Sequence, residues 1–524
     1  MAGAGASMNP PAPIAATVTG PRPWWETRPF VVFLILLSTV PLLYPTVPPL
    51  VDLPAHMGRY RVALAVGHPS PLAGWYGYDL KLIGNLGVDL LVYPLAKLIG
   101  LEAAVKLIIL SIPAMTVAGM LWVAREVHHR LPPTVLFAIP FAYSYPFLFG
   151  FVNFALSMAL AFLAFGFWLR LARKRRFRLR LALFAPISCV VWVAHTFGWG
   201  VLGLLAFSAE AVRQHDEGRP WWQAAYRAAL QAACLALPVV MMLLWRSSAG
   251  GSTIDFFAWS KKLQYLNSIL RDRWIIWDQT SAALVGLLLF LAIVVPKLTF
   301  SRNLAFSTLL LAAAFIVLPR MIFGSAYADM RLAPFAAAIA VLAIRFKRET
   351  DLRLARTLAF VGLAFVLART ATVTTSLAMA GFDQQAKLAA LDHVPRYARV
   401  VSLVSRCGQW ALTRNDHLPS MVTVRREGFS NDQWVMEGGN PLTIHYPQAR
   451  PFDVDESELV AAQRCARHRR TRTLDTSIPR IPAGAFDYLW LIDPGPFDTR
   501  VLRDWQLVWS GPGSFLYRYS AART

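Results

Sequence analysis

Charged residues are scarce in this chain of 524 residues: Asp, Glu, Lys and Arg together make up only 16% of it, and the acidic residues number 30. Apolar side chains make up 56% of the chain, and the mean hydropathy is +0.44. This composition is foreign to a soluble domain. It is typical of a helical protein that crosses a membrane several times.

Several motifs of well-known enzyme classes are also missing. The chain has no GxxxxGK[ST] loop for ATP, no HExxH zinc helix and no glycine-rich dinucleotide fingerprint after a strand. It has no G-x-S-x-G nucleophile elbow either. The sequence therefore indicates no cofactor and no metal site, with a divalent metal ion kept as an alternative.

Cysteine is rare as well, with four residues. Cys189 and Cys234 lie in apolar runs and are expected to be small buried hydrophobes. Cys407 and Cys465 fall in the polar C-terminal part, where an oxidising compartment would favour a disulfide between them. Two free thiols are the alternative.

The net charge of +22 is concentrated in short segments between apolar runs, such as 173–180 and 345–356. Basic loops of this kind are held on the cytoplasmic face, beside anionic lipid headgroups. The charge is thus a signal of membrane topology, and it predicts lipid as a partner and no nucleic acid.

About 11 apolar runs are predicted to span the membrane, because about 20 residues cross the hydrocarbon. They cover residues 30–50, 102–124, 131–148, 151–170, 182–195, 197–212, 227–245, 281–299, 303–320, 332–345 and 357–379. The stretch 182–212 is divided at His195 because only then do all basic loops share one side. The N-terminus is then cytoplasmic and the C-terminus outside, which in a bacterial inner membrane is the periplasm.

The predicted organisation has three parts. Residues 1–28 form a disordered cytoplasmic leader without a secretory signal pattern. Residues 29–380 form the transmembrane domain, whose first outer loop (51–101) is structured. Residues 381–524 form a soluble extracytoplasmic α/β or α+β domain.

Regular secondary structure is predicted in both the first outer loop and the outer domain. In the loop, 52–67 and 87–100 each read as an amphipathic helix that lies in the membrane interface. In the outer domain, β-like runs are expected at 398–404, 420–424, 487–493, 505–510 and 514–519.

Asp52 and His56 are the clearest candidates for chemistry. They lie four residues apart in Asp52-Leu-Pro-Ala-His56, directly after the first apolar run. Ionisable residues at the mouth of a membrane span are costly to hold there and indicate function. The alternative is that Asp52 caps the following helix and His56 simply lies at the interface.

An acid at the start of a structured first outer loop, in a multi-span protein with an outer domain, resembles the GT-C superfamily of glycosyltransferases. The resemblance implies transfer of a sugar from a polyprenyl-phosphate donor on the outer face, with Asp52 as the general base. His56 would orient Asp52, bind phosphate or help to bind a metal ion.

The same resemblance implies a basic residue on a late outer loop that holds the donor phosphate. Arg331 is the match, with Arg320 and Arg59 as further candidates, because guanidinium groups bind phosphate with paired hydrogen bonds. The alternatives are that Arg331 pairs with Asp329 or extends to lipid headgroups.

Four further residues are expected to line the cavity. His195 and Asn153 interrupt apolar stretches near the same face. The alternative is that each side chain only joins helices by a hydrogen bond to a neighbouring helix. Asp79 and Lys81 follow the aromatic residues 75–78, which suit sugar faces or membrane anchoring equally well.

The predicted function is therefore transfer of a sugar from a polyprenyl-phosphate donor to an envelope glycan, lipid or protein. A transporter or flippase of a lipid-linked or anionic substrate and an inactive GT-C-like scaffold are the alternatives. An enzyme should bring Asp52 and Arg331 to one cavity, whereas a transporter should show a path near the membrane midplane.

Overall fold

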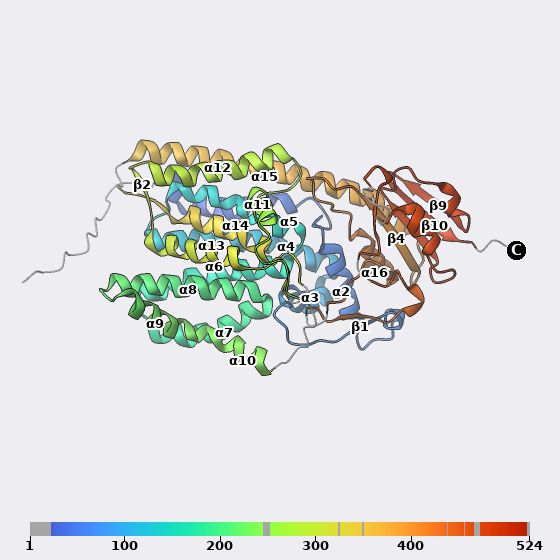
Figure 1. The fold of residues 1–524 in the computed structure, drawn as a ribbon, viewed down its shortest axis with the longest axis horizontal. Helices are drawn as coiled ribbons and strands as arrows, with labels where there is room; N and C mark the ends of the chain where they lie inside the picture. The colour runs from blue at the N-terminus through green and yellow to red at the C-terminus, as the bar shows by residue number, and fades with distance from the viewer. Residues whose placement is uncertain are drawn as a thin grey trace, which may run out of the picture.

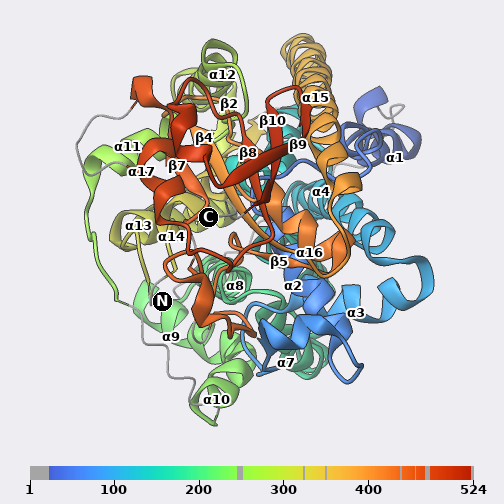
Figure 2. The same cartoon turned by 90° about the vertical axis from the view of Figure 1, so that its right-hand side faces the viewer.

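The computed structural model describes residues 23–244, 252–322, 325–347, 351–436, 439–454, 456–465 and 472–520. The molecule is elongated, with a helical part (residues 23–388) at one end and a C-terminal part with a β-sheet (residues 389–520) at the other (Figure 1). Seen from the C-terminal end, the sheet lies in front of the helices (Figure 2).

The helices of the described residues are α1 (Arg28–Leu37), α2 (Leu53–Ala65), α3 (Gly87–Ile99), α4 (Leu101–His128), α5 (Tyr145–Phe149), α6 (Val152–Arg173), α7 (Phe177–Ala194), α8 (Thr196–Asp216), α9 (Trp221–Ala232), α10 (Leu237–Leu244), α11 (Trp259–Asn267), α12 (Ile275–Val294), α13 (Arg302–Val317), α14 (Ala328–Ala343), α15 (Leu352–Leu388), α16 (Met421–Arg426) and α17 (Leu474–Ser477). The strands are β1 (Tyr76–Tyr78), β2 (Leu298–Phe300), β3 (Ile344–Phe346), β4 (Arg399–Arg406), β5 (Phe429–Ser430), β6 (Leu442–Ile444), β7 (Leu459–Ala461), β8 (Tyr488–Ile492), β9 (Trp505–Gly511) and β10 (Ser514–Tyr519).

Six helical segments among the described residues are long and apolar enough to cross a membrane: Leu101–His128, Val152–Arg173, Phe177–Ala194, Trp221–Leu243, Ile275–Val294 and Leu352–His393. The protein is thus an integral membrane protein, but the predicted count of about 11 spans is not confirmed. Several other predicted spans correspond to shorter apolar helices, Arg28–Leu42, Pro133–Phe149 and Arg302–Val317.

The predicted span at 131–148 is not a continuous α-helix. A 3₁₀ helix covers Pro133–Tyr143, and the short α5 follows it. Pro133 and Pro140 explain the difference, because proline lacks the backbone N–H of the α-helical hydrogen bond and its ring clashes with the preceding turn.

The predicted break at His195 is confirmed. α7 ends at Ala194 and α8 begins at Thr196, because His195 adopts an extended conformation (φ −170°, ψ 137°). This turn brings His195 to the end of the bundle that faces the C-terminal part, where it lines a cavity.

The predicted leader at 1–28 lies mostly outside the described residues. Its last residues are ordered in the structure: Trp24–Glu26 form a 3₁₀ turn, and Arg130 Nε lies 3.1 Å from Glu26 Oε1. The described residues thus begin a few residues before the expected start of the transmembrane domain.

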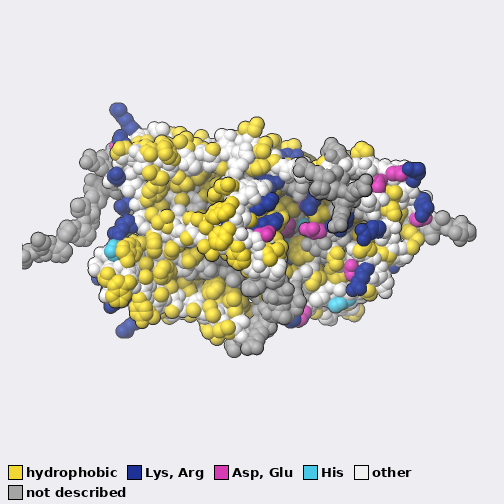
Figure 3. Space-filling view, in the orientation of Figure 1, with side chains coloured by type: hydrophobic (Ala, Val, Ile, Leu, Met, Phe, Trp, Pro, Cys, Tyr) yellow, Lys and Arg dark blue, Asp and Glu magenta, His cyan; other side chains and the backbone are white. Residues whose placement is uncertain are grey.

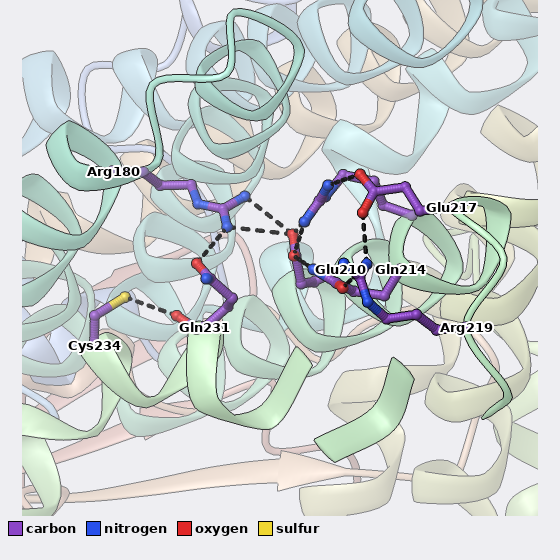
Figure 4. Close-up of polar contacts among 8 residues, drawn as sticks. Arg180, Glu210, Gln214, Glu217, Arg219, Gln231 and Cys234 are labelled. Atoms are coloured by element: carbon purple, nitrogen blue, oxygen red, sulfur yellow. Dashed lines mark hydrogen bonds and ion pairs between the residues drawn. The ribbon is translucent and has the colours of Figure 1, made fainter. Parts of the chain in front are cut away.

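Hydrophobic side chains cover the visible flank of the helical part, and Lys and Arg gather at the end far from the C-terminal part (Figure 3). Arg180 belongs to the first basic block in the sequence, yet it is fully buried. Its guanidinium donates to Glu210 on α8 and to Gln231 on α9, at 3.2 and 2.9 Å (Figure 4). This residue therefore joins three helices inside the bundle.

The C-terminal part contains a mixed sheet in the order β5-β4-β8-β10-β9, with β7 also paired to β4. β4 runs parallel to β5, β7 and β8, whereas β10 is antiparallel to both β8 and β9. The runs predicted at 398–404, 487–493, 505–510 and 514–519 are thus confirmed as strands.

The prediction of a strand at 420–424 is wrong, because residues 421–424 belong to α16 and Ser420 is its N-cap. Met421 to Val424 are all buried, so no exposed face alternates with a buried one. Asp432 anchors the preceding turn by accepting hydrogen bonds from the backbone N–H and the hydroxyl of Ser420, at 2.6 and 2.8 Å. Strand propensity yields readily to such tertiary contacts.

The first outer loop is built into the C-terminal part, since β1 pairs antiparallel with β6. Both helices predicted in this loop form, as α2 and α3. Leu90 and Leu91 of α3 are exposed, as expected for a helix in the membrane interface. In contrast, α2 is buried over Leu53–Tyr60, because it packs against α3, α4 and α16.

Cys407 and Cys465 form a disulfide, with Cα atoms 5.6 Å apart. The prediction of a bridge is therefore confirmed. Cys189 and Cys234 are free and half-buried.

Candidate active site

A cavity of about 290 Å³ lies between the helical part and the C-terminal part. The helical part contributes residues from the start of α2, from α5 and α6, from the α7–α8 turn and from the start of α14, namely Asp52, His56, Arg59, Asn85, Phe149, Phe151, Asn153, Phe154, His195, Ser325, Tyr327 and Arg331. The C-terminal part contributes Arg406, Asp416, His417, Trp434, Met436, Asn440, Glu456 and Leu459.

Asp52 is held at the wall of this cavity by its backbone. Its N–H donates to the Phe149 carbonyl at 3.0 Å. Gly150 lies against it with φ +104°, and a Cβ on Gly150 would be 2.6 Å from the Asp52 nitrogen. Asp52 occupies the N-cap position of α2 without a side-chain capping bond. The alternative that Asp52 caps this helix therefore holds for its position but not for a capping hydrogen bond.

His56 lies one turn further along α2 and is 8% exposed. The Trp434 ring packs edge-on against it, with ring centroids 5.3 Å apart. Burial, aided by the charge of Arg59, lowers the pKa of His56 well below its ordinary value. The imidazole is thus neutral near pH 7 and offers the cavity a hydrogen-bonding group without a charge.

Arg331 projects from the first turn of α14 into the same cavity and is 8% exposed. Its Nη1 donates to Ser325 Oγ at 3.3 Å, and its Cζ lies 4.3 Å from the Phe151 ring centroid. The carboxylate of Asp52 acts on it electrostatically. A buried cation and a carboxylate thus line the same cavity.

The alternatives for Arg331 do not hold. Asp329 pairs with Lys262, whose Nζ is 3.2 Å from Asp329 Oδ2 and also donates to two backbone carbonyls. Asp329 therefore pairs with Lys262 and not with Arg331, and the Arg331 side chain lines the cavity. Its burial also argues against extension to headgroups.

Arg59 reaches the cavity, but its guanidinium is committed to Asp89 through two hydrogen bonds of 2.8 and 2.9 Å. Burial alone would lower the pKa of Arg59, yet the Asp89 carboxylate outweighs it and raises the pKa. Asn153 Nδ2 supports the pair by donating to Asp89 Oδ2 at 3.0 Å. Asn153 also donates to the Asn85 carbonyl, so it both lines the cavity and joins elements.

Arg320 does not line the cavity. Its Nε donates to the Tyr265 hydroxyl at 3.3 Å, its Nη1 lies 3.6 Å from Asp255, and its Cζ rests 5.2 Å from the ring centroid of Tyr327. Tyr327 does line the cavity. Arg320 therefore touches the cavity only through this ring.

His195 lines the cavity, and its Nδ1 accepts a hydrogen bond from the Phe197 N–H at 3.1 Å. This bond caps α8 and leaves the proton of a neutral ring on Nε2. Asp79 and Lys81 are far more exposed, lie 2.8 Å apart as an ion pair and do not line the cavity.

Sequence reasoning missed the entire contribution of the C-terminal part. His417 is the most informative of these residues, because its Nε2 lies 4.0 Å from Asp52 Oδ1. Asp416 and His417 stand alone in a polar stretch, and no local pattern separates them from other surface residues. Among the described residues, no group of three or more His, Cys, Asp or Glu side chains is placed to hold a metal ion.

No family model and no curated protein matches this sequence. The chain is similar to one in the single-particle cryo-EM structure of the arabinofuranosyltransferase AftD from mycobacteria, with a TM-score of 0.43 and 17% identity. The match covers 95% of this chain and 40% of that chain, so this protein spans less than half its length.

Proposed function

We propose that this protein is a membrane glycosyltransferase of the GT-C type, which moves a sugar from a polyprenyl-phosphate donor to a hydroxyl of an envelope glycan, lipid or protein. One observation carries the proposal: a buried carboxylate, Asp52, and a buried guanidinium, Arg331, line the same cavity. Ionisable groups are costly to hold in such a place, and perturbed pairs in a cleft mark functional sites.

The two groups match the two charges that the reaction develops. The bond between the sugar C1 and the phosphate oxygen breaks, and its electron pair stays with the phosphate. The acceptor oxygen bonds to C1 and gives its proton to Asp52, which acts as the general base. Arg331 offsets the charge on the leaving phosphate with paired N–H donors.

The residues around Asp52 and Arg331 suit these two roles. Phe149, Phe151 and Phe154 surround Arg331's side of the cavity, where the first isoprenoid units of a lipid donor find apolar contact. Trp434 and Asn440 lie on the opposite, C-terminal side, where an aromatic face and an amide suit the sugar rings of an acceptor. His195 and His56 complete the wall as neutral hydrogen-bonding groups.

The test is transfer from polyprenyl-phosphate sugars by membranes that contain wild-type protein or Asp52→Asn at matched expression. We expect the variant to lose about 10²–10⁴-fold in rate, the usual contribution of a general base, while it still binds the donor. Asp79→Asn is the matched control, because Asp79 is exposed and outside the cavity.

Equal activity of Asp52→Asn and wild type would remove Asp52 from the mechanism. Passage of uncleaved donor across proteoliposomes, without any transfer, would instead favour the transporter. Neither activity from any donor would favour the inactive scaffold.

A further inference from the structure

His417 stands between two carboxylates that come from different parts of the chain. Its Nε2 lies 4.0 Å from Asp52 Oδ1, and its Nδ1 lies 3.8 Å from Glu458 Oε1. Asp52 belongs to the helical part, whereas His417 and Glu458 belong to the C-terminal part. The side chains of His417 and Glu458 are 12% and 0% exposed.

Glu458 is fixed beside β4, because the N–H of Val404 donates to its backbone carbonyl at 2.7 Å. Its carboxylate is completely buried next to the imidazole. Burial of an ionised carboxylate is costly unless its charge is used, and a carboxylate behind a histidine fixes the tautomer of the ring.

The ring of His417 is also held in place. The Trp434 ring packs against two of the histidines that line the cavity, with its centroid 5.0 Å from that of His417 and 5.3 Å from that of His56. The turn Leu418–Ser420 follows His417 directly, and Asp432 anchors it through Ser420. His417 is therefore positioned by the fold on both sides.

We propose that His417, backed by Glu458, is a positioning residue that returns Asp52 to its carboxylate form after each transfer. This inference rests on the proposed function. After transfer, Asp52 holds the acceptor's proton on one carboxyl oxygen. That O–H bond breaks, and the proton forms a new N–H bond at His417 Nε2.

Glu458 makes this step favourable in two ways. Its negative charge, 3.8 Å from Nδ1, favours a proton on that nitrogen, so that Nε2 can accept the proton from Asp52, and the same charge stabilises the imidazolium that results. The imidazolium then loses its proton to water, and no oxidant, reductant or further reactant is required. The 4.0 Å gap shortens when substrate fills the cavity or is bridged by one water, as is common for catalytic contacts in unliganded enzymes.

The charges around His417 keep it ready to accept a proton. Burial lowers the pKa of His417, and Arg406 acts in the same direction, whereas Asp416, a hydrogen bond with the Asp432 backbone and Glu456 act to raise it. His56, a further ionisable neighbour beside Asp52 and Glu458, is itself neutral. The imidazole is therefore neutral near pH 7 and becomes protonated only when the pH falls below 6.5, the ordinary pKa of histidine.

The experiment compares His417→Gln, Glu458→Gln and wild type by kcat, KM and the pH profile of kcat. We expect His417→Gln to lower kcat at least about tenfold with little change in KM for the donor. We expect Glu458→Gln to move the acid limb of the profile to lower pH, because loss of the negative charge makes the imidazolium less stable. His445→Gln is the control, since His445 is exposed and outside the cavity.

A double variant gives the sharper result. Because His417 acts through Asp52, Asp52→Asn with His417→Gln should be no slower than Asp52→Asn alone. Wild-type kcat and an unchanged acid limb in both single variants would overturn the inference. If Asp52→Asn is inactive in that case, the proposed function stands; if Asp52→Asn is fully active, the role of Asp52 fails first.

If His417→Gln does not fold, the pH profile of Glu458→Gln decides the question by itself.

Discussion

At the scale of the single residue, the charge of Arg331 is buried, and the neighbouring acid pairs with another residue. Asp329, two positions away, is engaged by Lys262 at 3.2 Å. The guanidinium touches Ser325 and the Phe151 ring, and these contacts leave donors for an anion. Asp52 and Arg331 thus bring a carboxylate and a guanidinium to one cavity.

We expect Arg331→Gln to lower kcat/KM for the lipid-phosphate donor by roughly 10- to 150-fold, the equivalent of one lost hydrogen bond to a charged group. Arg331→Lys should recover part of this loss, because it restores the charge without the paired donors. Steady-state kinetics in detergent would measure both. Arg320→Gln serves as the control, and equal effects at the two positions would contradict the assignment.

A second residue-scale prediction concerns the glycine that fixes Asp52. Gly150→Ala would place a Cβ 2.6 Å from the Asp52 nitrogen in a conformation with φ +104°, which costs on the order of 1–3 kcal/mol. We expect a lower melting temperature and reduced transfer, because Asp52 has to move. Gly74→Ala is the matched control, since nothing lies within 4 Å of its Cβ position. Wild-type activity in Gly150→Ala would show that the base tolerates displacement.

At the scale of elements, buried polar contacts join helices that apolar packing alone would leave free to slide. Arg180 of α7 is bonded to Glu210 of α8 and Gln231 of α9 (Figure 4). Arg59 of α2 is bonded to Asp89 of α3. These pairs fix the relative positions of helices and thereby the shape of the cavity.

We expect Glu210→Ala to destabilise the protein by roughly 3–5 kcal/mol, because it leaves the Arg180 guanidinium buried without its carboxylate. Glu217→Ala should cost about 1 kcal/mol or less, because Glu217 is 45% exposed in its ion pairs. Melting temperatures in detergent would measure the difference. A similar drop for the two variants would mean that the buried pair contributes no more than a surface pair.

At the scale of the whole molecule, the helical part separates a basic end from the end that carries the cavity and the sheet (Figure 3). Basic loops stay on the cytoplasmic side. We therefore predict that the cavity and the Cys407–Cys465 disulfide lie on the outer side, where a disulfide is stable.

Cysteine labelling in intact cells tests this orientation. In a background with Cys189→Ser and Cys234→Ser, an impermeant maleimide should label Arg450→Cys and leave Arg175→Cys unlabelled until the cells are opened. Arg450 is exposed in the C-terminal part, and Arg175 lies at the α6–α7 turn at the basic end. The reverse pattern would place the cavity on the cytoplasmic side.

Much of the fold was accessible from the sequence, because composition and periodicity are local properties. The membrane class, the break at His195, the two short helices of the first loop and four of the five predicted strands were expected. The segments that failed depend on context. Pro133 and Pro140 turn a span into a 3₁₀ run, and the contacts of Ser420 turn a strand-like run into α16.

The sequence by itself determined that this protein enters a membrane and that Asp52 and His56 directly follow its first apolar run, since both follow from residues close together in the chain. Only the tertiary structure decided which partners they have. In the folded protein Arg59 is hydrogen-bonded to Asp89, whereas Arg331 lines the cavity. The tertiary structure also brought His417 to Asp52 from a distant part of the chain. Contacts between distant segments depend on how whole elements pack, and no local pattern of residue types records that packing.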